Sequence, residues 1–186
     1  MSKKNVAFVF SGAAARIAQQ AVLMRYLVQG KAFKDGKPIV PKVLAGASSG
    51  AISVVALNAI LISEGLIEGN LKDNFSWTDY EDIIRSLDRK NVYKAGGILR
   101  RALEVVGDDA LFATEPLREL LEDTLVARLG LQKLGDLPIN SYISVVEQKT
   151  GTTHRLSSKN HPDLPLVDVL MASAAIPVLF PPVDLT

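Results

Sequence analysis

Two stretches near the start of the chain follow the same order of apolar and polar positions. In each, a short apolar run leads into small residues and then into a longer apolar or amphipathic segment. The first covers Asn5 to Val28 and ends at Gly30, and the second covers Val43 to Ile62 and ends at Gly65. Short apolar runs are typical of buried strands, and longer segments with helical periodicity are typical of helices. The pattern predicts strand, turn, helix, then strand, turn, helix.

This alternation predicts the fold class. Alternating strands and helices indicate an α/β protein, and right-handed crossovers make its strands parallel. We expect a three-layer domain with a central, mostly parallel sheet and helices on both faces. Open sheets of this kind bind ligands at the carboxyl ends of their strands. If the two strands are neighbours, backbone amides around Gly12 to Ala14 face the second turn.

Residues 64–112 differ in character, because polar positions are mixed with scattered aromatic ones. Thr78 with Glu81 predicts a capping box ahead of a helix from Asp79 to Leu87. We interpret 64–112 as a helical insertion within the domain. It is either a lid or acyl-chain pocket that faces a substrate, or a group of helices that only covers the sheet.

The last third of the chain predicts further elements. Thr114 is a suitable N-cap for a helix. Ile139 to Val146 predicts a strand, and Thr152 to Leu156 pairs back on it as a hairpin. A final helix is expected to begin at residues 162–165 and to run to about Ala172.

The turn after the second strand carries the clearest chemical motif, Gly46-Ala47-Ser48-Ser49-Gly50, which has the form G-x-S-x-G. A serine between a strand and a helix is pushed out of the packing by a sharp turn, and glycines on either side keep Cβ atoms out of the bend. The helix N-terminus also favours a developing anion. Ser48 is therefore the candidate nucleophile. The alternative is a Gly/Ser-rich loop that only caps the helix.

Composition narrows the function classes. The chain has 186 residues, which fits one domain, and a net charge of +1, which gives no strong field for nucleic acid or an anionic membrane. It has no cysteine, so disulfides and thiolate chemistry are excluded. Its two histidines, His154 and His161, are too few for a histidine-based metal site.

The N-terminus has two interpretations. Lys3-Lys4, an apolar run to Phe10 and the small residues 11–15 have the parts of a signal peptide. We prefer a first strand and turn, because the amphipathic pattern continues directly after Arg16. No apolar stretch reaches the roughly 18 residues that span a bilayer. We expect a protein that is cytoplasmic or peripheral to a membrane, with secretion left open.

Three stretches in register resemble the patatin-like phospholipase family over essentially the whole chain. Phe10 to Arg16 is similar to the family's glycine-rich oxyanion loop, and Gly46 to Gly50 is similar to its serine elbow. Ala172 to Pro177, which leads into Phe180-Pro181-Pro182, resembles the approach to its catalytic aspartate.

The resemblance implies a serine lipid acyl hydrolase of the phospholipase A or lysophospholipase type, with a Ser–Asp dyad and without metal or cofactor. Ser48 is the implied nucleophile, the amides of Gly12, Ala13 and Ala14 form the oxyanion hole, and Arg16 anchors the loop. An exposed arginine at a helix start is the alternative for Arg16. The implied substrate is a phospholipid or lysophospholipid, with peripheral membrane contact and no nucleic acid.

Two departures from the family pattern affect the site. Ala13, Ala14 and Ile17 stand where the family has glycines, and a Cβ at a positive φ costs about 1 kcal/mol or more. These alanines motivate a second hypothesis, a catalytically degenerate module that binds lipid or protein. His154 motivates a third, an acyl-carrier transacylase that uses Ser48 and His154, although a hairpin histidine facing solvent is the simpler interpretation.

The family's aspartate lies in an Asp-Gly-small motif downstream of the Pro-Pro segment. The one Asp-Gly pair of this chain, Asp35-Gly36, precedes the serine and lies in a polar turn, so we reject it as the base. Asp184 lies near the right place but no glycine follows it. We expect residues 1–186 to be the N-terminal part of a truncated patatin-like domain, inactive alone, with its aspartate beyond Thr186.

Overall fold

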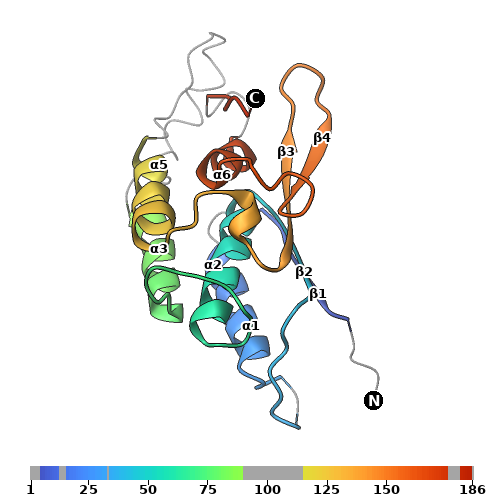
Figure 1. Cartoon of the computed structure of the whole chain (residues 1–186), viewed down its shortest axis with the longest axis vertical. Coiled ribbons are helices and arrows are strands. Elements are labelled where there is room, and N and C mark those ends of the chain that lie inside the picture. Colours follow the sequence, from blue (N-terminus) through green and yellow to red (C-terminus); the bar gives the residue numbers. More distant parts are fainter. Residues whose placement is uncertain (1–4, 13–15, 33, 90–114, 176–180, 186) are drawn as a thin grey trace.

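A computed structural model describes residues 5–12, 16–32, 34–89, 115–175 and 181–185 (Figure 1). Strands alternate with helices along the chain, as the sequence pattern predicts. The segment η3 is a π-helix and η4 is a 3₁₀-helix. In chain order the elements are β1 (Ala7–Phe10), α1 (Ile17–Val28), β2 (Val43–Ala47), α2 (Ser49–Ser63), α3 (Trp77–Arg89), α5 (Glu115–Leu121), η3 (Glu122–Arg128), η4 (Leu134–Asp136), β3 (Asn140–Val146), β4 (Thr153–Ser157) and α6 (Leu166–Ala174).

The four strands form one sheet in the order β1-β2-β3-β4. The first three are parallel, and β4 returns antiparallel as the second strand of the predicted hairpin. The prediction of an α/β fold with a mostly parallel sheet is confirmed. Phe10 pairs with Gly46, so β1 and β2 end together and the turns that follow them lie at the same edge of the sheet.

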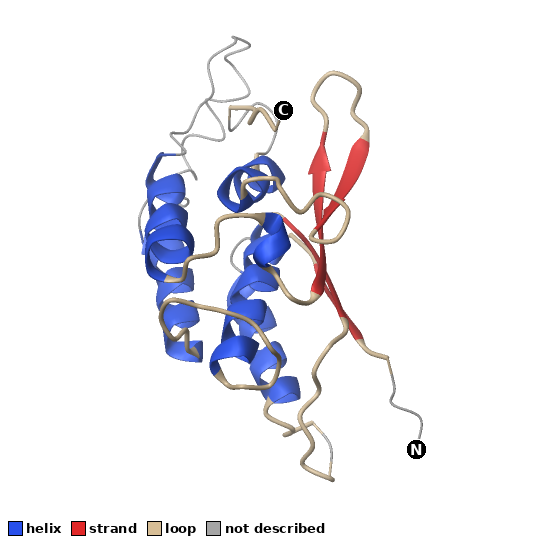
Figure 2. Cartoon of the chain, in the orientation of Figure 1, coloured by secondary structure: helices blue, strands red, loops and turns tan. Residues whose placement is uncertain are grey.

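The described helices lie on one side of the sheet (Figure 2). Strand order explains this arrangement, because the chain moves from β1 to β2 and from β2 to β3 in the same direction. Two right-handed crossovers in one direction place α1 and α2 on the same face. On the opposite face Val9 is 78% exposed and Val146 is 57% exposed. A second helical layer over that face stays a prediction.

Helix α2 is the centre of the core. Its residues from Gly50 to Leu61 are all buried, including the two polar ones, Ser53 and Asn58. A helix that is apolar on every side must be covered on every side. It packs against β2, and α1 and α6 also contact it. None of the described helices is long and apolar enough to cross a membrane.

The two polar residues of α2 tie it to neighbouring elements. The hydroxyls of Ser53 and Tyr80 lie 2.7 Å apart, and burial raises the pKa of Tyr80 to about 12. The Asn58 side chain donates to the Ser141 hydroxyl at 3.1 Å and accepts the Ile139 amide at 3.1 Å. Buried polar groups cost little when they are paired in this way. Both interruptions of the apolar run therefore fix the orientation of α2.

The predicted start of α3 is wrong by two residues. The helix begins at Trp77, and Ser76 is its N-cap, because its hydroxyl accepts the Asp79 amide while the Asp79 carboxylate accepts the Ser76 amide. These two reciprocal hydrogen bonds form a capping box between the N-cap residue and the third residue of the helix. Glu81, the expected partner in the box, instead binds Arg25 of α1 at 3.0 Å. Helix α3 belongs to the predicted insertion, whose residues 90–112 lie outside the described part of the chain.

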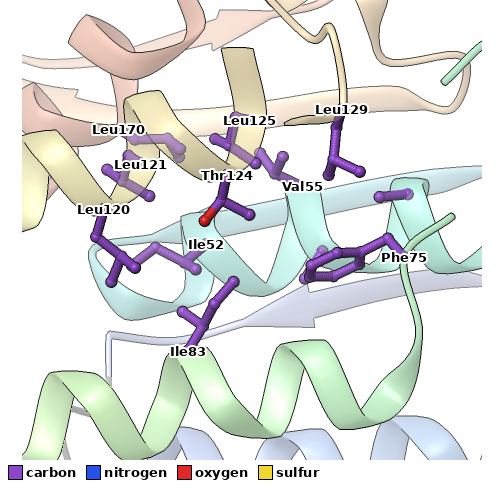
Figure 3. A pocket seen from close by; sticks show the side chains of 12 residues that line it. Ile52, Val55, Phe75, Ile83, Leu120, Leu121, Thr124, Leu125, Leu129 and Leu170 are labelled. Atoms are coloured by element: carbon purple, nitrogen blue, oxygen red, sulfur yellow. The ribbon is translucent and has the colours of Figure 1, made fainter. Parts of the chain in front are cut away.

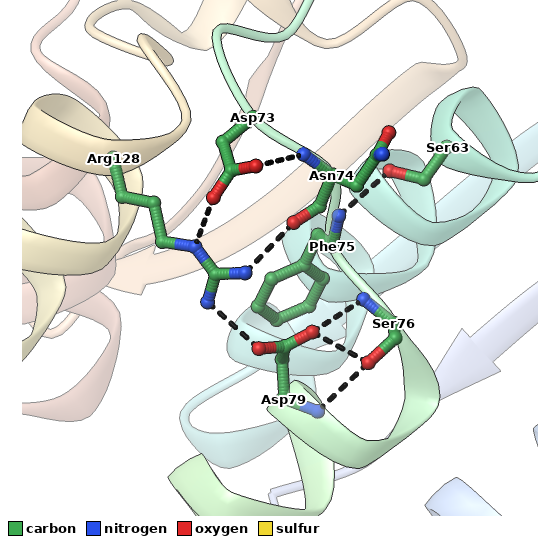
Figure 4. Close-up of polar contacts among 7 residues, drawn as sticks. All are labelled: Ser63, Asp73, Asn74, Phe75, Ser76, Asp79 and Arg128. Atoms are coloured by element: carbon green, nitrogen blue, oxygen red, sulfur yellow. Dashed lines mark hydrogen bonds and ion pairs between the residues drawn. The ribbon is translucent and has the colours of Figure 1, made fainter.

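Arg128 at the end of η3 joins three segments (Figure 4). Its Nε donates to Asp73 at 2.8 Å, its Nη1 to Asp79 at 2.7 Å and its Nη2 to the carbonyl of Asn74 at 2.8 Å. The hydrogen bond from Arg128 lowers the pKa of Asp79 to about 2. One guanidinium therefore holds the loop before α3, the cap of α3 and the π-helix together.

We expect Arg128→Met to lower the free energy of unfolding by about 2 kcal/mol at pH 7, with allowance for solvent screening of these partly exposed groups. The pKa of Asp79 is depressed in the fold, so the stabilisation is complete above pH 4 and is lost as the pH falls toward 2. Urea unfolding at pH 7 and pH 3 checks this, with Lys37→Met as a control that removes an exposed, weakly paired cation. An equal loss at both pH values contradicts the prediction.

Candidate active site

Ser48 lies in a sharp turn between β2 and α2. Its φ is 53° and its ψ is −126°, and it is the one non-glycine residue with a positive φ in the described part of the chain. Such a conformation costs of order 1–3 kcal/mol and persists where the surrounding structure holds it. The strained strand–turn–helix junction expected of the motif is present.

The two motif glycines allow close approach of backbone segments. A Cβ on Gly46 would lie 2.3 Å from the Gly50 carbonyl oxygen, and a Cβ on Gly50 would lie 2.3 Å from the carbonyl oxygen of Phe10. Real Cβ atoms do not approach other atoms so closely, so any side chain at either position forces backbone to move. The absence of a side chain at Gly46 lets the two ends of the serine turn approach each other. The absence of a side chain at Gly50 lets the start of α2 pack against the end of β1.

The Ser48 side chain does not cap α2. The backbone of Ser48 makes two hydrogen bonds instead. Its carbonyl accepts the Ala51 amide at 2.8 Å, and its own N–H donates to the Ser173 hydroxyl at 2.9 Å. The residue is half-buried. The Ser48 hydroxyl therefore takes no part in capping α2.

The turn after β1 lies beside the serine. A Cβ on Gly12 would be 3.2 Å from the Cβ of Ser48 and 3.9 Å from its Oγ. Gln20 of α1 holds this turn, because its side-chain amide donates to the carbonyl of Ser11 at 3.0 Å. Ala13 and Ala14, the other two predicted oxyanion donors, lie outside the described residues.

Arg16 stands at the N-cap of α1 and is exposed. Its side chain makes no hydrogen bond or ion pair with other described residues. Its predicted role as anchor of the loop stays a prediction, because the residues between it and Gly12 are not among those described.

The other titratable candidates lie in different surroundings. His154 is exposed on β4, two strands away from β2, and its Nε2 is 3.5 Å from the Glu147 carboxylate. Asp35 lies in an exposed turn after α1 and accepts the Lys37 amide at 3.4 Å. Asp184 lines a surface recess together with His161. Among the described residues, no three His, Cys, Asp or Glu side chains are grouped as a metal site.

An apolar seam runs along α2 and begins at Ile52, one turn after Ser48 (Figure 3). Its free volume is about 10 Å³. That is the space of roughly one water molecule. In this conformation of the protein the seam is too small to hold an acyl chain. Its apolar side chains form part of the packed core. It is lined by Ile52, Val55, Ala56, Ala59, Phe75, Ile83, Leu120, Leu121, Thr124, Leu125, Leu129 and Leu170.

Two residues next to the site were not singled out from the sequence for a role. Gln20 has the polarity of a solvent-facing helix position, and Ser173 is a small residue at the end of an apolar helix. Both bind backbone groups of another segment: Gln20 binds the carbonyl of Ser11, nine residues before it, and Ser173 binds the amide of Ser48, 125 residues before it. Periodicity carries no signal for such contacts, because it reports only which face of an element is buried.

Comparisons with known proteins identify the family of the chain. Among solved structures it is similar to ExoU in the ExoU–SpcU complex of the type III secretion system of Pseudomonas aeruginosa, with 17% identity and a TM-score of 0.47. The match covers 93% of this chain and 36% of that one, so this chain spans about a third of the neighbour's length. No curated protein matches. A family model for patatin-like phospholipase matches residues 8–186, and the chain therefore belongs to the patatin-like phospholipase family.

Proposed function

We propose that this chain carries the nucleophile of a serine lipid acyl hydrolase of the phospholipase A or lysophospholipase type. The observation that carries the proposal is the strained backbone of Ser48. The side chain of this residue makes no capping hydrogen bond to α2 and lies beside Gly12. A backbone conformation that costs stability is typical of residues that act in catalysis. Membership of the family supports lipid hydrolysis as the general activity.

In the proposed reaction, the Ser48 Oγ attacks the ester carbonyl and its proton passes to a carboxylate base. A carboxyl group in a partly desolvated site has a raised pKa and can accept this proton without a histidine. The family resemblance assigns the base to an aspartate in an Asp-Gly-small motif downstream of Pro182. Attack of the Ser48 Oγ turns the ester carbonyl oxygen into the oxyanion of a tetrahedral intermediate. This oxyanion needs preorganised N–H donors.

We place those donors in the turn of Gly12, Ala13 and Ala14. The Ser48 amide already donates to Ser173 and is therefore not available to an oxyanion. Gly12, the described residue of this turn, has its backbone beside the Ser48 side chain. The N-terminus of α2 adds partial positive charge at the same place. Loss of one such donor typically costs about 10²- to 10³-fold in rate.

A catalytically degenerate module that binds lipid or protein is the second candidate. Ala13 and Ala14 favour it, since their Cβ atoms restrict the backbone conformations open to an oxyanion loop. A fluorophosphonate probe distinguishes the two, because it reacts with an activated serine and not with an ordinary one.

We expect the probe to label Ser48 in the folded, full-length protein, with the adduct located by mass spectrometry. Ser48→Ala should abolish labelling and hydrolysis of a lysophospholipid. Ser49→Ala and His154→Ala should retain both, the first as a control for a neighbouring hydroxyl and the second as a test of the transacylase alternative. Absence of labelling in folded protein contradicts the hydrolase and favours the binding module.

A further inference from the structure

The backbone amide of Ser48 is held by one side chain from a distant element. Its N–H donates to the Oγ of Ser173 at 2.9 Å, and the same Oγ donates to the carbonyl of Ser144 at 2.8 Å. Ser173 lies in the last turn of α6, and Ser144 pairs with Ala47 across β2 and β3. One hydroxyl therefore links the elbow to α6 and to the strand next to it.

This amide has no partner within its own helix. The first N–H groups of an α-helix lack intrahelical acceptors, and the N-cap N–H is among those that need an external one. Without a partner, the peptide between Ala47 and Ser48 is free to rotate toward a relaxed φ. A change of φ at Ser48 moves its Cβ and Oγ relative to Gly12, next to which they now lie. Small displacements of reacting atoms have large kinetic effects, about 100-fold for 1 Å.

We infer that Ser173 is a positioning residue for Ser48: its hydroxyl keeps the peptide of Ser48 in the strained orientation that places the serine side chain beside Gly12. The inference rests on the proposed function, because it assigns Ser173 a part in the same reaction. Ser173 touches no reacting atom and acts through the backbone of Ser48. The role needs a hydroxyl, because one group must accept from an amide and donate to a carbonyl at once.

The chain provides a matched control at the other end of β3. The Oγ of Ser158 accepts the Ser141 amide at 3.0 Å and donates to the carbonyl of Ile139 at 3.3 Å. This is the same pair of bonds, made by a buried hydroxyl to backbone groups at the start of β3, where the parallel strands begin. Loss of Ser158 has a comparable structural effect without contact with the elbow.

The test compares Ser173→Ala, Ser173→Thr and Ser158→Ala with the unmodified full-length protein. The readouts are the rate constant of fluorophosphonate labelling at Ser48 and the kcat and KM for a lysophospholipid. We expect Ser173→Ala to lower the labelling rate and kcat by about 10- to 100-fold with little change in KM. Ser173→Thr, which keeps the hydroxyl, should recover most of the rate, and Ser158→Ala should stay within about threefold of the unmodified protein. Equal rates in Ser173→Ala and Ser158→Ala overturn the inference.

Hydrogen exchange separates failure of this inference from failure of the proposed function. In Ser173→Ala the Ser48 amide should exchange at least about tenfold faster, whereas Ser158→Ala should leave that amide protected. If the unmodified protein is not labelled by the probe, the proposed function fails while the exchange measurement still decides whether Ser173 holds the amide. Unchanged exchange at Ser48 in Ser173→Ala overturns the inference regardless of labelling.

Discussion

Gly50→Ala is expected to lose about 4 kcal/mol of unfolding free energy, because its new Cβ meets backbone. The methyl group would lie 2.3 Å from the Phe10 carbonyl oxygen and 2.7 Å from the Phe10 carbonyl carbon. Neither atom is the end of a flexible side chain, so α2 must move away from β1. Overpacking in a core costs typically 1–3 kcal/mol and more where the backbone must shift. A chain of this length loses about 2–4 °C of melting temperature per kcal/mol, so thermal unfolding should show a fall of roughly 10 °C.

Gly46→Ala should behave in the same way, since its Cβ would lie 2.3 Å from the Gly50 carbonyl oxygen. Gly36→Ala provides the contrast. A Cβ there meets nothing within 4 Å, and the cost comes only from its φ of +64°, about 1 kcal/mol. If Gly50→Ala is no less stable than Gly36→Ala, the elbow is not packed against β1 as the structure has it.

Ser48→Gly is expected to remove activity and to make the protein more stable. Loss of the proposed nucleophile should lower the hydrolysis rate by about 10⁴-fold or more. Glycine adopts a φ of 53° without the penalty that a Cβ brings. Relief of about 1–3 kcal/mol of strain is opposed by about 0.5–1 kcal/mol of extra chain entropy in the unfolded state, which leaves a net gain of about 1 kcal/mol.

Ser48→Ala isolates the two effects. It also removes the hydroxyl but keeps the Cβ, so activity is lost while the strain remains. Chemical unfolding of the three proteins, each checked for folding by circular dichroism, should rank Ser48→Gly above both Ser48→Ala and the unmodified chain. A glycine variant that is less stable than the alanine variant would show that the positive φ of Ser48 stores no strain.

The elbow illustrates what could be predicted from local pattern. Gly46, Ser48 and Gly50 are close in sequence, and the chemistry of a tight strand–turn–helix junction restricts which residues fit there. The same holds for the two flanking elements, because the apolar run of α2 is too long for a strand and the short apolar run of β2 ends at the glycine turn. The helix ends at Gly30 and Gly65 were also predictable, since both have the positive φ that glycine adopts readily.

Contacts between distant elements were not predictable in the same way. The capping box of α3 was assigned to Thr78 and Glu81, but Arg25 binds Glu81, and Arg128 binds Asp79 beside Ser76. Competition among several charged partners decided which local motif formed. Likewise, α/β alternation predicts helices around a sheet but not which face each one covers.

The amino-acid sequence by itself determined the kinds of elements, their order, the parallel sheet and the serine at the elbow. These follow from hydrophobic period, glycine positions and the handedness of crossovers, which are properties of neighbouring residues. Only the tertiary structure decided that the described helices share one face, that Gly12 lies against Ser48, and that Ser173 holds its amide. Those facts depend on strand order and on hydrogen bonds between residues up to 125 positions apart, which no short-range pattern encodes.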